Sequence, residues 1–166
     1  PTGSVYSHEE LAGLAEVIKK HEGVYVMADE IYEHINYIGK HTSIAKIEGM
    51  KERSIIVNGV SKAYAMTGWR IGYIAAPEWI VKGCNKLQGQ YTSGPCSVSQ
   101  KAAEAAYTLE QGCVEDMRKA FERRRDLIVK LAKDIPGLEV NVPEGAFYLF
   151  PKCSSFFGKS NGEKTI

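Results

Sequence analysis

Residues 61–70 read SKAYAMTGWR, and they lie between two short apolar runs at 54–58 and 71–76. Runs of this length that are rich in isoleucine and valine, or in aromatic residues, predict strands, so the stretch between them is predicted to be a turn. This turn carries a lysine with a serine before it, and an arginine eight residues after the lysine. A nucleophilic amine and a guanidinium on one turn indicate a site for a phosphate-bearing ligand.

The rest of the sequence predicts an α/β fold. Three short runs are almost wholly apolar, which is typical of strands in a sheet that is covered on both faces. The first of them, 24–28, ends at Asp29, and a helix before it begins at a capping box formed by Ser7 and Glu10 and runs to about His21. The later elements are helices at 78–90, 97–111 and 114–134, strands at 138–142 and 146–150, and a polar loop at 154–164.

Composition excludes several classes of function. The 166 residues carry 21 basic and 20 acidic side chains, so the net charge of +1 leaves no basic surface for nucleic acid. No apolar run approaches the ~20 residues of a membrane span, and the first residues show no signal-peptide pattern. Cys84, Cys96, Cys113 and Cys153 show no CxxC pairing and no histidine at metal-ligand spacing. We therefore expect no metal site, and free thiols in a cytoplasmic protein.

The string VNGVSKAYAMTGWRIGY at 57–73, together with DEIY at 29–32, resembles the class I/II aminotransferases of the fold-type I pyridoxal-phosphate family. Within that family it is most similar to the aspartate-aminotransferase-like branch. The resemblance implies the C-terminal half of a large α/β domain followed by the start of a small α+β domain. The expected parts are 1–112 of the large pyridoxal-phosphate domain, a connecting helix at 113–135, and the start of the small domain at 136–166.

Five residues are expected to bind pyridoxal phosphate. The resemblance implies that Lys62 holds the cofactor aldehyde as a Schiff base and then moves a proton as a base, although a lysine alone on a turn is usually a surface residue. The planar fork of Arg70 suits the phosphate, and the hydroxyl of Ser61 could reach the same group or serve only the turn. Asp29 follows a buried strand, where a carboxylate could hold the ring nitrogen or cap a helix. Tyr32 would share a face with Asp29 and bind the ring oxygen.

The implied reaction moves an amino group between an amino acid, with aspartate expected first, and a 2-oxo acid. A shared cofactor cradle does not fix the reaction, so an aromatic or prephenate aminotransferase and a β-eliminating C–S lyase remain alternatives. Residues 90–95 resemble a segment at the family's dimer interface, which implies a homodimer. The aromatic residues of 145–148 resemble a strand that lines the substrate entrance, whereas His34 and His41 are expected to pack or face solvent.

The chain is expected to be a fragment, because it begins PTG where the family has NPTG and its end carries no stop signal. The family's substrate-carboxylate arginine, its glycine-rich phosphate loop and its ring-stacking aromatic all lie outside it. The family also often has a serine at the position of Gly59, so one phosphate contact falls to a backbone amide or is missing. The chain alone is therefore expected to be inactive, and a non-catalytic folding or assembly fragment is a further alternative.

Overall fold

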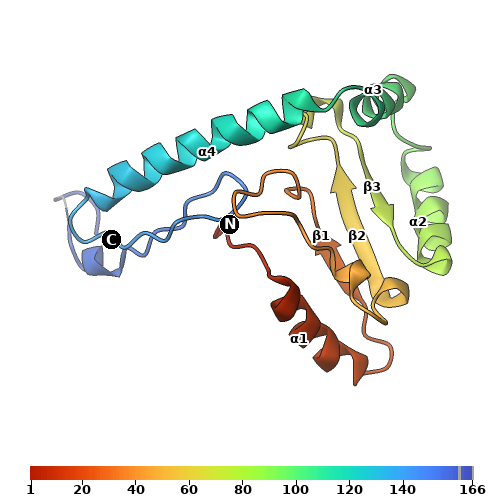
Figure 1. The fold of residues 1–166 in the computed structure, drawn as a ribbon, viewed down its shortest axis with the longest axis horizontal. Helices are drawn as coiled ribbons and strands as arrows, with labels where there is room; N and C mark the ends of the chain where they lie inside the picture. The colour runs from red at the N-terminus through yellow and green to blue at the C-terminus, as the bar shows by residue number, and fades with distance from the viewer. Residues whose placement is uncertain (161, 166) are drawn as a thin grey trace.

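The computed structural model describes residues 1–160 and 162–165, and its helices surround a small sheet on several sides (Figure 1). The helices are α1 (His8–Lys19), α2 (Glu78–Tyr91), α3 (Ser97–Thr108) and α4 (Gly112–Lys133), and the strands are β1 (Val26–Asp29), β2 (Ser54–Gly59) and β3 (Gly72–Ala75). Four short 3₁₀ helices accompany them: η1 (Ile44–Lys46), η2 (Lys51–Arg53), η3 (Thr67–Trp69) and η4 (Ser154–Phe156). Among the described helices, none has the length and apolarity needed to cross a lipid bilayer.

The sheet has the order β1-β2-β3 and is mixed rather than parallel throughout. β1 pairs parallel with β2, and Asp29 lies opposite Val57. β2 pairs antiparallel with β3, and Gly59 lies opposite Gly72. The carboxyl ends of β1 and β2 therefore meet at one edge of the sheet, which is where α/β folds place ligand-binding groups.

The main core lies between α1 and the sheet. Leu11 and Ala15 of α1 are buried against Ile44, Ile47 and Met50, which belong to the segment around η1. Ile18, Val26, Ala28 and Ile56 pack against this cluster. The predicted capping box of α1 is present, since Ser7 accepts from the amide of Glu10 while the Glu10 carboxylate accepts from the amide of Ser7.

Arg53 ties the end of α1 to the start of β2. Its Nη1 donates to the carbonyl of Ile18 at 3.1 Å and its Nε to the carbonyl of Val24 at 3.2 Å, while Nη2 donates to the carbonyl of His21. The last carbonyls of a helix have no partner within the helix, so a guanidinium there satisfies them and complements the helix dipole. This arrangement fixes how β1 leaves the helix and hence where Asp29 lies.

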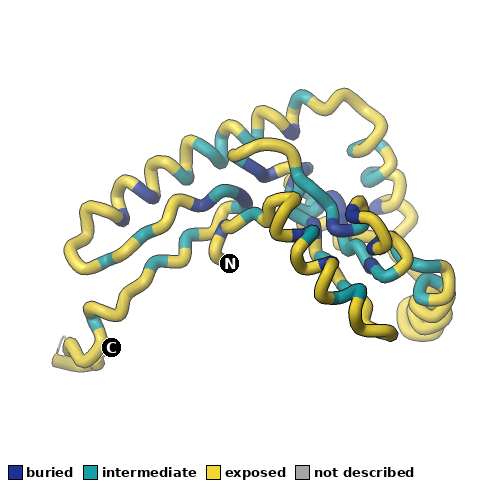
Figure 2. Tube along the Cα trace, turned by 60° about the horizontal axis from the view of Figure 1, so that its bottom comes forward, coloured by how far each residue is buried: buried dark blue, intermediate teal, exposed yellow. Residues whose placement is uncertain are grey.

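The sheet is less covered than the sequence predicts. Residues of β1 alternate between half-buried and exposed, and three of the four residues of β3 are exposed. Figure 2 shows the buried residues gathered around the sheet and α1, while exposed residues dominate α2 and the outer side of α4. The expectation of a sheet buried on both faces is therefore wrong for this chain, because only the α1 side carries a continuous apolar layer.

The C-terminal region also differs from the prediction in part. α4 is the long helix expected there, and the chain then runs back beside it (Figure 1). The two strands predicted at 138–142 and 146–150 are absent, and only isolated bridges form, Glu139 with Lys152 and Asn36 with Gly145. Ala146 has a φ of 56°, which an extended strand does not allow. The predicted loop at 154–164 includes η4, and its residue 161 lies outside the described residues.

Candidate functional site

The turn at 61–70 is closed by contacts among the residues that the sequence singles out. The Thr67 hydroxyl donates to the carbonyl of Ser61 at 3.0 Å, and Arg70 Nη1 donates to the carbonyl of Thr67 at 3.0 Å. Arg70 itself has a left-handed backbone, with φ of 51°. Ser61 and Arg70 are thereby held on one closed turn, and Lys62 lies on the same turn directly after Ser61.

Gly59 stands at the root of this turn, where β2 and β3 approach closely. A Cβ at position 59 would lie 2.9 Å from Cα of Gly72 and 3.0 Å from the carbonyl oxygen of Ile71. The Gly59 amide donates to Oδ1 of Asn58 at 2.7 Å, so it is already engaged. A side chain at position 59 would collide with the backbone of β3, which explains the glycine.

Asp29 lies at the carboxyl end of β1, and its side chain closes a local turn. Its Oδ1 accepts from the amide of Ile31 at 3.2 Å, so the capping role considered from the sequence is real, although the cap is on a turn rather than a helix. The other carboxylate oxygen is left for a ligand. One use of the carboxylate does not preclude the other, because an ionised carboxylate has about four acceptor positions.

Tyr32 and Lys62 meet at one aromatic side chain from the C-terminal segment. The Phe147 ring lies 5.3 Å from the Tyr32 ring, edge to face, and Lys62 Nζ lies 5.9 Å from the centre of the same Phe147 ring. The Tyr32 hydroxyl is 2.6 Å from the Tyr148 hydroxyl. Phe147 thus contacts both Tyr32 and Lys62, and Tyr148 contacts Tyr32. From the sequence, these two aromatic residues are expected only to line a substrate entrance.

The electrostatics of these residues suit an anionic ligand with a basic ring. Burial, the Tyr148 hydroxyl and the negative charge of Asp29 all raise the pKa of Tyr32, so this phenol stays protonated at neutral pH. Within 1–160 and 162–165, neither Lys62 nor Arg70 has a carboxylate partner, and Asp29 has no basic one. In this part of the chain, Lys62 and Arg70 are therefore left to bind an anion, and Asp29 is left to bind a positively charged group.

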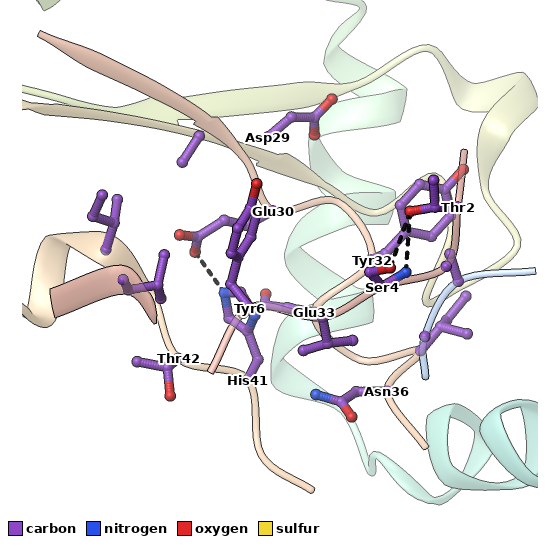
Figure 3. A pocket seen from close by; sticks show the side chains of 18 of the residues that line it. Thr2, Ser4, Tyr6, Asp29, Glu30, Tyr32, Glu33, Asn36, His41 and Thr42 are labelled. Atoms are coloured by element: carbon purple, nitrogen blue, oxygen red, sulfur yellow. Dashed lines mark hydrogen bonds and ion pairs between the residues drawn. The ribbon is translucent and has the colours of Figure 1, made fainter. Parts of the chain in front are cut away.

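A cavity of about 470 Å³ opens beside β1, and Figure 3 shows Asp29 and Tyr32 at its wall. Tyr148 also lines this cavity, together with the first six residues of the chain and with Leu11 and Leu14 of α1. Ser61, Lys62 and Arg70 do not line this cavity. The structure therefore divides the predicted site into an acid and phenol half at the cavity and a cationic half on the neighbouring turn, joined through Phe147.

A cluster of three polar side chains near the site, Glu30, Glu33 and His41, could not be predicted from the sequence. His41 Nε2 lies 3.0 Å from Oε2 of the buried Glu30, and Glu33 lies near enough that the three side chains have ligand atoms within 4.8 Å of one another (Figure 3). Glu33 Oε1 accepts a hydrogen bond from the side-chain amide of Asn58 at 2.7 Å. Because each carboxylate already has a partner, we assign these residues to fixing the loop after β1. The seven residues between Glu33 and His41 carry no periodic pattern that would reveal the contact.

Comparison with known proteins places this geometry in context. A sequence model of the family described as aminotransferase class I and II matches residues 1–159. An aspartate aminotransferase of Pinus pinaster is 50% identical over 162 residues, which cover 95% of this chain and 33% of the relative. An aspartate/prephenate aminotransferase of Cereibacter sphaeroides is 44% identical over 97% of this chain and 41% of its own length.

Solved structures agree with these relatives. The crystal structure of the aspartate aminotransferase from Rhizobium meliloti superposes with a TM-score of 0.95 at 44% sequence identity. It covers 100% of this chain and 42% of the solved chain. The chain therefore spans between a third and a little over two fifths of the length of these proteins.

Proposed function

The chain belongs to the class I and II aminotransferase family, and we propose that the protein of which it forms part moves an amino group between an amino acid and a 2-oxo acid. The proposed cofactor is pyridoxal 5′-phosphate, and the proposed amino acid is aspartate. The observation that carries the proposal is the meeting of Lys62, Tyr32 and Phe147 beside Asp29.

The residues present fit that cofactor in their chemistry. Pyridoxal phosphate offers an aldehyde, a phosphate, a ring oxygen and a ring nitrogen that is best kept protonated. Lys62 supplies an amine, and Arg70 supplies a guanidinium with no carboxylate partner in the described part of the chain. Asp29 supplies a carboxylate with a free oxygen, and Tyr32 a neutral phenol that can donate a hydrogen bond. Ser61 adds a half-buried hydroxyl on the same turn as Lys62.

Each residue then has a defined task. The bound cofactor supplies an electron sink that makes the substrate Cα–H acidic. Nζ of Lys62 takes the proton from that carbon and later returns it, so this amine acts as general base and acid. Asp29 holds a positive charge on the ring nitrogen, and Tyr32 donates toward the ring oxygen. Arg70, with Ser61, binds the phosphate through its planar fork and keeps the reacting atoms in place.

The parts of the protein are proposed from the same resemblance. Residues 1–112 would belong to the large domain, 113–135 to a connecting helix that corresponds to α4, and 136–166 to the start of the small domain. A second copy of the protein is proposed to cover α2 and the segment 90–95. The support is that α2 buries none of its residues in this chain, and Tyr91 is 84% exposed. A cytoplasmic location is proposed because all four cysteines are unpaired and exposed.

The test is turnover of aspartate with 2-oxoglutarate by the full-length protein. We expect Lys62→Ala to abolish this turnover, because no other amine in the turn can replace Nζ. Lys101→Ala is the matched control, since Lys101 is an exposed lysine of α3 that pairs with Glu104 of its own helix. The 166-residue chain by itself should have no useful activity, because it lacks a large share of the contacts that the family's site requires. Activity that survives Lys62→Ala would contradict the proposal.

The identity of the substrate is decided by the same assay. Turnover of prephenate in preference to 2-oxoglutarate would assign the protein to the aspartate/prephenate branch, to which the relative from Cereibacter sphaeroides belongs by name. Release of pyruvate and a thiol from a cysteine thioether, without amino transfer, would instead identify a C–S lyase. Either result keeps the proposed cofactor site and replaces the proposed reaction.

A further inference from the structure

The hydroxyl of Tyr148 is placed directly against that of Tyr32. The two oxygens are 2.6 Å apart although the residues are 116 positions apart in the sequence. Their rings also meet edge to face at 5.7 Å. Either oxygen could be the donor by distance alone, so the direction of this hydrogen bond depends on the other groups that the two hydroxyls bind.

The backbone before Tyr148 is held at both of its hydrogen-bonding groups. The Ala146 amide donates to the carbonyl of Ile35 at 2.8 Å, and the Tyr37 hydroxyl donates to the carbonyl of Ala146. Ala146 also has a φ of 56°, a conformation that costs energy in a residue with a side chain. The loop after β1 therefore dictates the direction in which the chain leaves Ala146.

The side chains that follow are packed as well as anchored. Phe147 stacks on Phe121 of α4 with a ring separation of 5.2 Å and lies 5.1 Å from the Tyr148 ring. Phe147 also touches Tyr32, so Tyr148 cannot turn away without disturbing its own two aromatic neighbours, Tyr32 and Phe147. Although Tyr148 is 41% exposed, its anchored backbone and its two ring contacts direct its hydroxyl at Tyr32.

We propose that Tyr148 is a positioning residue, whose hydroxyl donates to Oη of Tyr32 and so leaves the Tyr32 hydrogen free for the ring oxygen of the cofactor. This inference rests on the proposed function. A phenol carries a single hydrogen, so Tyr32 cannot donate to Tyr148 and to a ligand at once. A hydrogen bond donated to the Tyr32 oxygen also polarises the O–H bond of Tyr32. This strengthens the hydrogen bond that Tyr32 donates in turn. Without a ligand, burial, the Tyr148 hydroxyl and Asp29 all raise the pKa of Tyr32, as expected when Tyr32 is the donor in this pair. When the ring oxygen takes the Tyr32 hydrogen, the bond between the two hydroxyls reverses its direction, and burial and Asp29 still favour the neutral phenol.

The proposal predicts a change in how the bound cofactor titrates. A hydrogen bond donated to the ring oxygen would withdraw electron density from the cofactor and would make the Lys62 nitrogen that holds the cofactor less basic. Loss of the Tyr148 hydroxyl weakens that bond, so the pH at which the visible absorbance of the bound cofactor changes should rise by about 0.5 unit. The dissociation constant of the cofactor should rise about 3-fold. Tyr32→Phe should give a larger shift in the same direction.

The experiment is a pH titration of absorbance on the full-length protein loaded with pyridoxal phosphate, for Tyr148→Phe, Tyr32→Phe and the double variant. Tyr148→Phe is expected to shift the titration on its own and to add nothing in the Tyr32→Phe background. Tyr148→Met, which also lacks the hydroxyl but changes the ring packing, should give the same shift as Tyr148→Phe. Tyr64→Phe is the control, since its hydroxyl donates to Gln111 at 2.8 Å and should leave the titration unchanged.

Two results would overturn the inference. An unchanged titration in Tyr148→Phe would mean that the hydroxyl has no influence on Tyr32, and an equal shift in both backgrounds would mean that Tyr148 acts without Tyr32. Failure of the wild-type protein to take the cofactor onto Lys62 is a different result, because it removes the proposed function itself. The two failures are therefore distinguishable in one series of measurements.

Discussion

Gly59→Ala should destabilise the protein by about 1–3 kcal/mol, because the added methyl group has no space between β2 and β3. The new Cβ would stand 2.9 Å from Cα of Gly72 and 3.0 Å from the Ile71 carbonyl oxygen, where ordinary contact begins at 3.4 Å. Both obstacles are backbone atoms, so no side chain can rotate away. The strands must separate by several tenths of an ångström at the pair where Gly59 faces Gly72.

The assay is urea unfolding of the full-length protein at 25 °C, with the same amount of bound cofactor in every sample. Gly68→Ala is the matched control, since Gly68 lies in the same turn and an added Cβ there would meet nothing within 4 Å. Its unfolding free energy should stay within about 0.5 kcal/mol of wild type. Equal values for the two variants would refute the reasoning, because they would show that the approach of β2 and β3 imposes no constraint at position 59.

Three further predictions test other parts of the account. Gly13→Ala should stabilise the protein by about 0.5–1 kcal/mol in the same urea assay, because Gly13 is inside α1 and its added Cβ would be free of contacts; a loss of stability would contradict this. Burial alone would raise the pKa of Glu30, but the bonds from His41 and Ser43 outweigh it and hold that pKa below 4.5. This stabilisation is present above pH 4.5 and is lost as the pH falls through the lowered value, so Glu30→Gln should show a shallower loss of unfolding free energy in acid, and a parallel loss would argue against it. Arg70→Lys should raise the dissociation constant of pyridoxal phosphate at least ~10-fold in equilibrium dialysis, because the charge stays while the planar fork is lost; unchanged affinity would show that Arg70 does not bind the phosphate.

Local patterns in the sequence predicted most of the elements correctly. The capping box at Ser7, the strand that ends at Asp29 and the strand in the apolar run 71–76 all depend on near neighbours, and all three are present. The predicted bounds of the next two helices are wrong by a few residues, since α3 stops at Thr108 rather than near Gln111 and α4 begins at Gly112 rather than 114. Helix ends without a side-chain cap leave little signal in the sequence.

Long-range contacts explain what the sequence could not predict. The strand expected at 146–150 fails because Ala146 bonds to Ile35 and Tyr37, more than a hundred positions away, and takes a left-handed conformation. The same contacts bring Phe147 and Tyr148 to Tyr32, which no spacing rule reveals. The roles of Asp29, Tyr32, Ser61, Lys62 and Arg70 toward a cofactor stay predictions, supported by their places in the fold.

Binding of pyridoxal phosphate to the amine of Lys62 can be tested directly. The full-length protein would be mixed with pyridoxal phosphate, reduced with borohydride, digested and mapped by peptide mass spectrometry. The account predicts one cofactor adduct, on Lys62, and its loss in Lys62→Ala. Labelling scattered over exposed lysines such as Lys82 and Lys101, with none concentrated on Lys62, would contradict it.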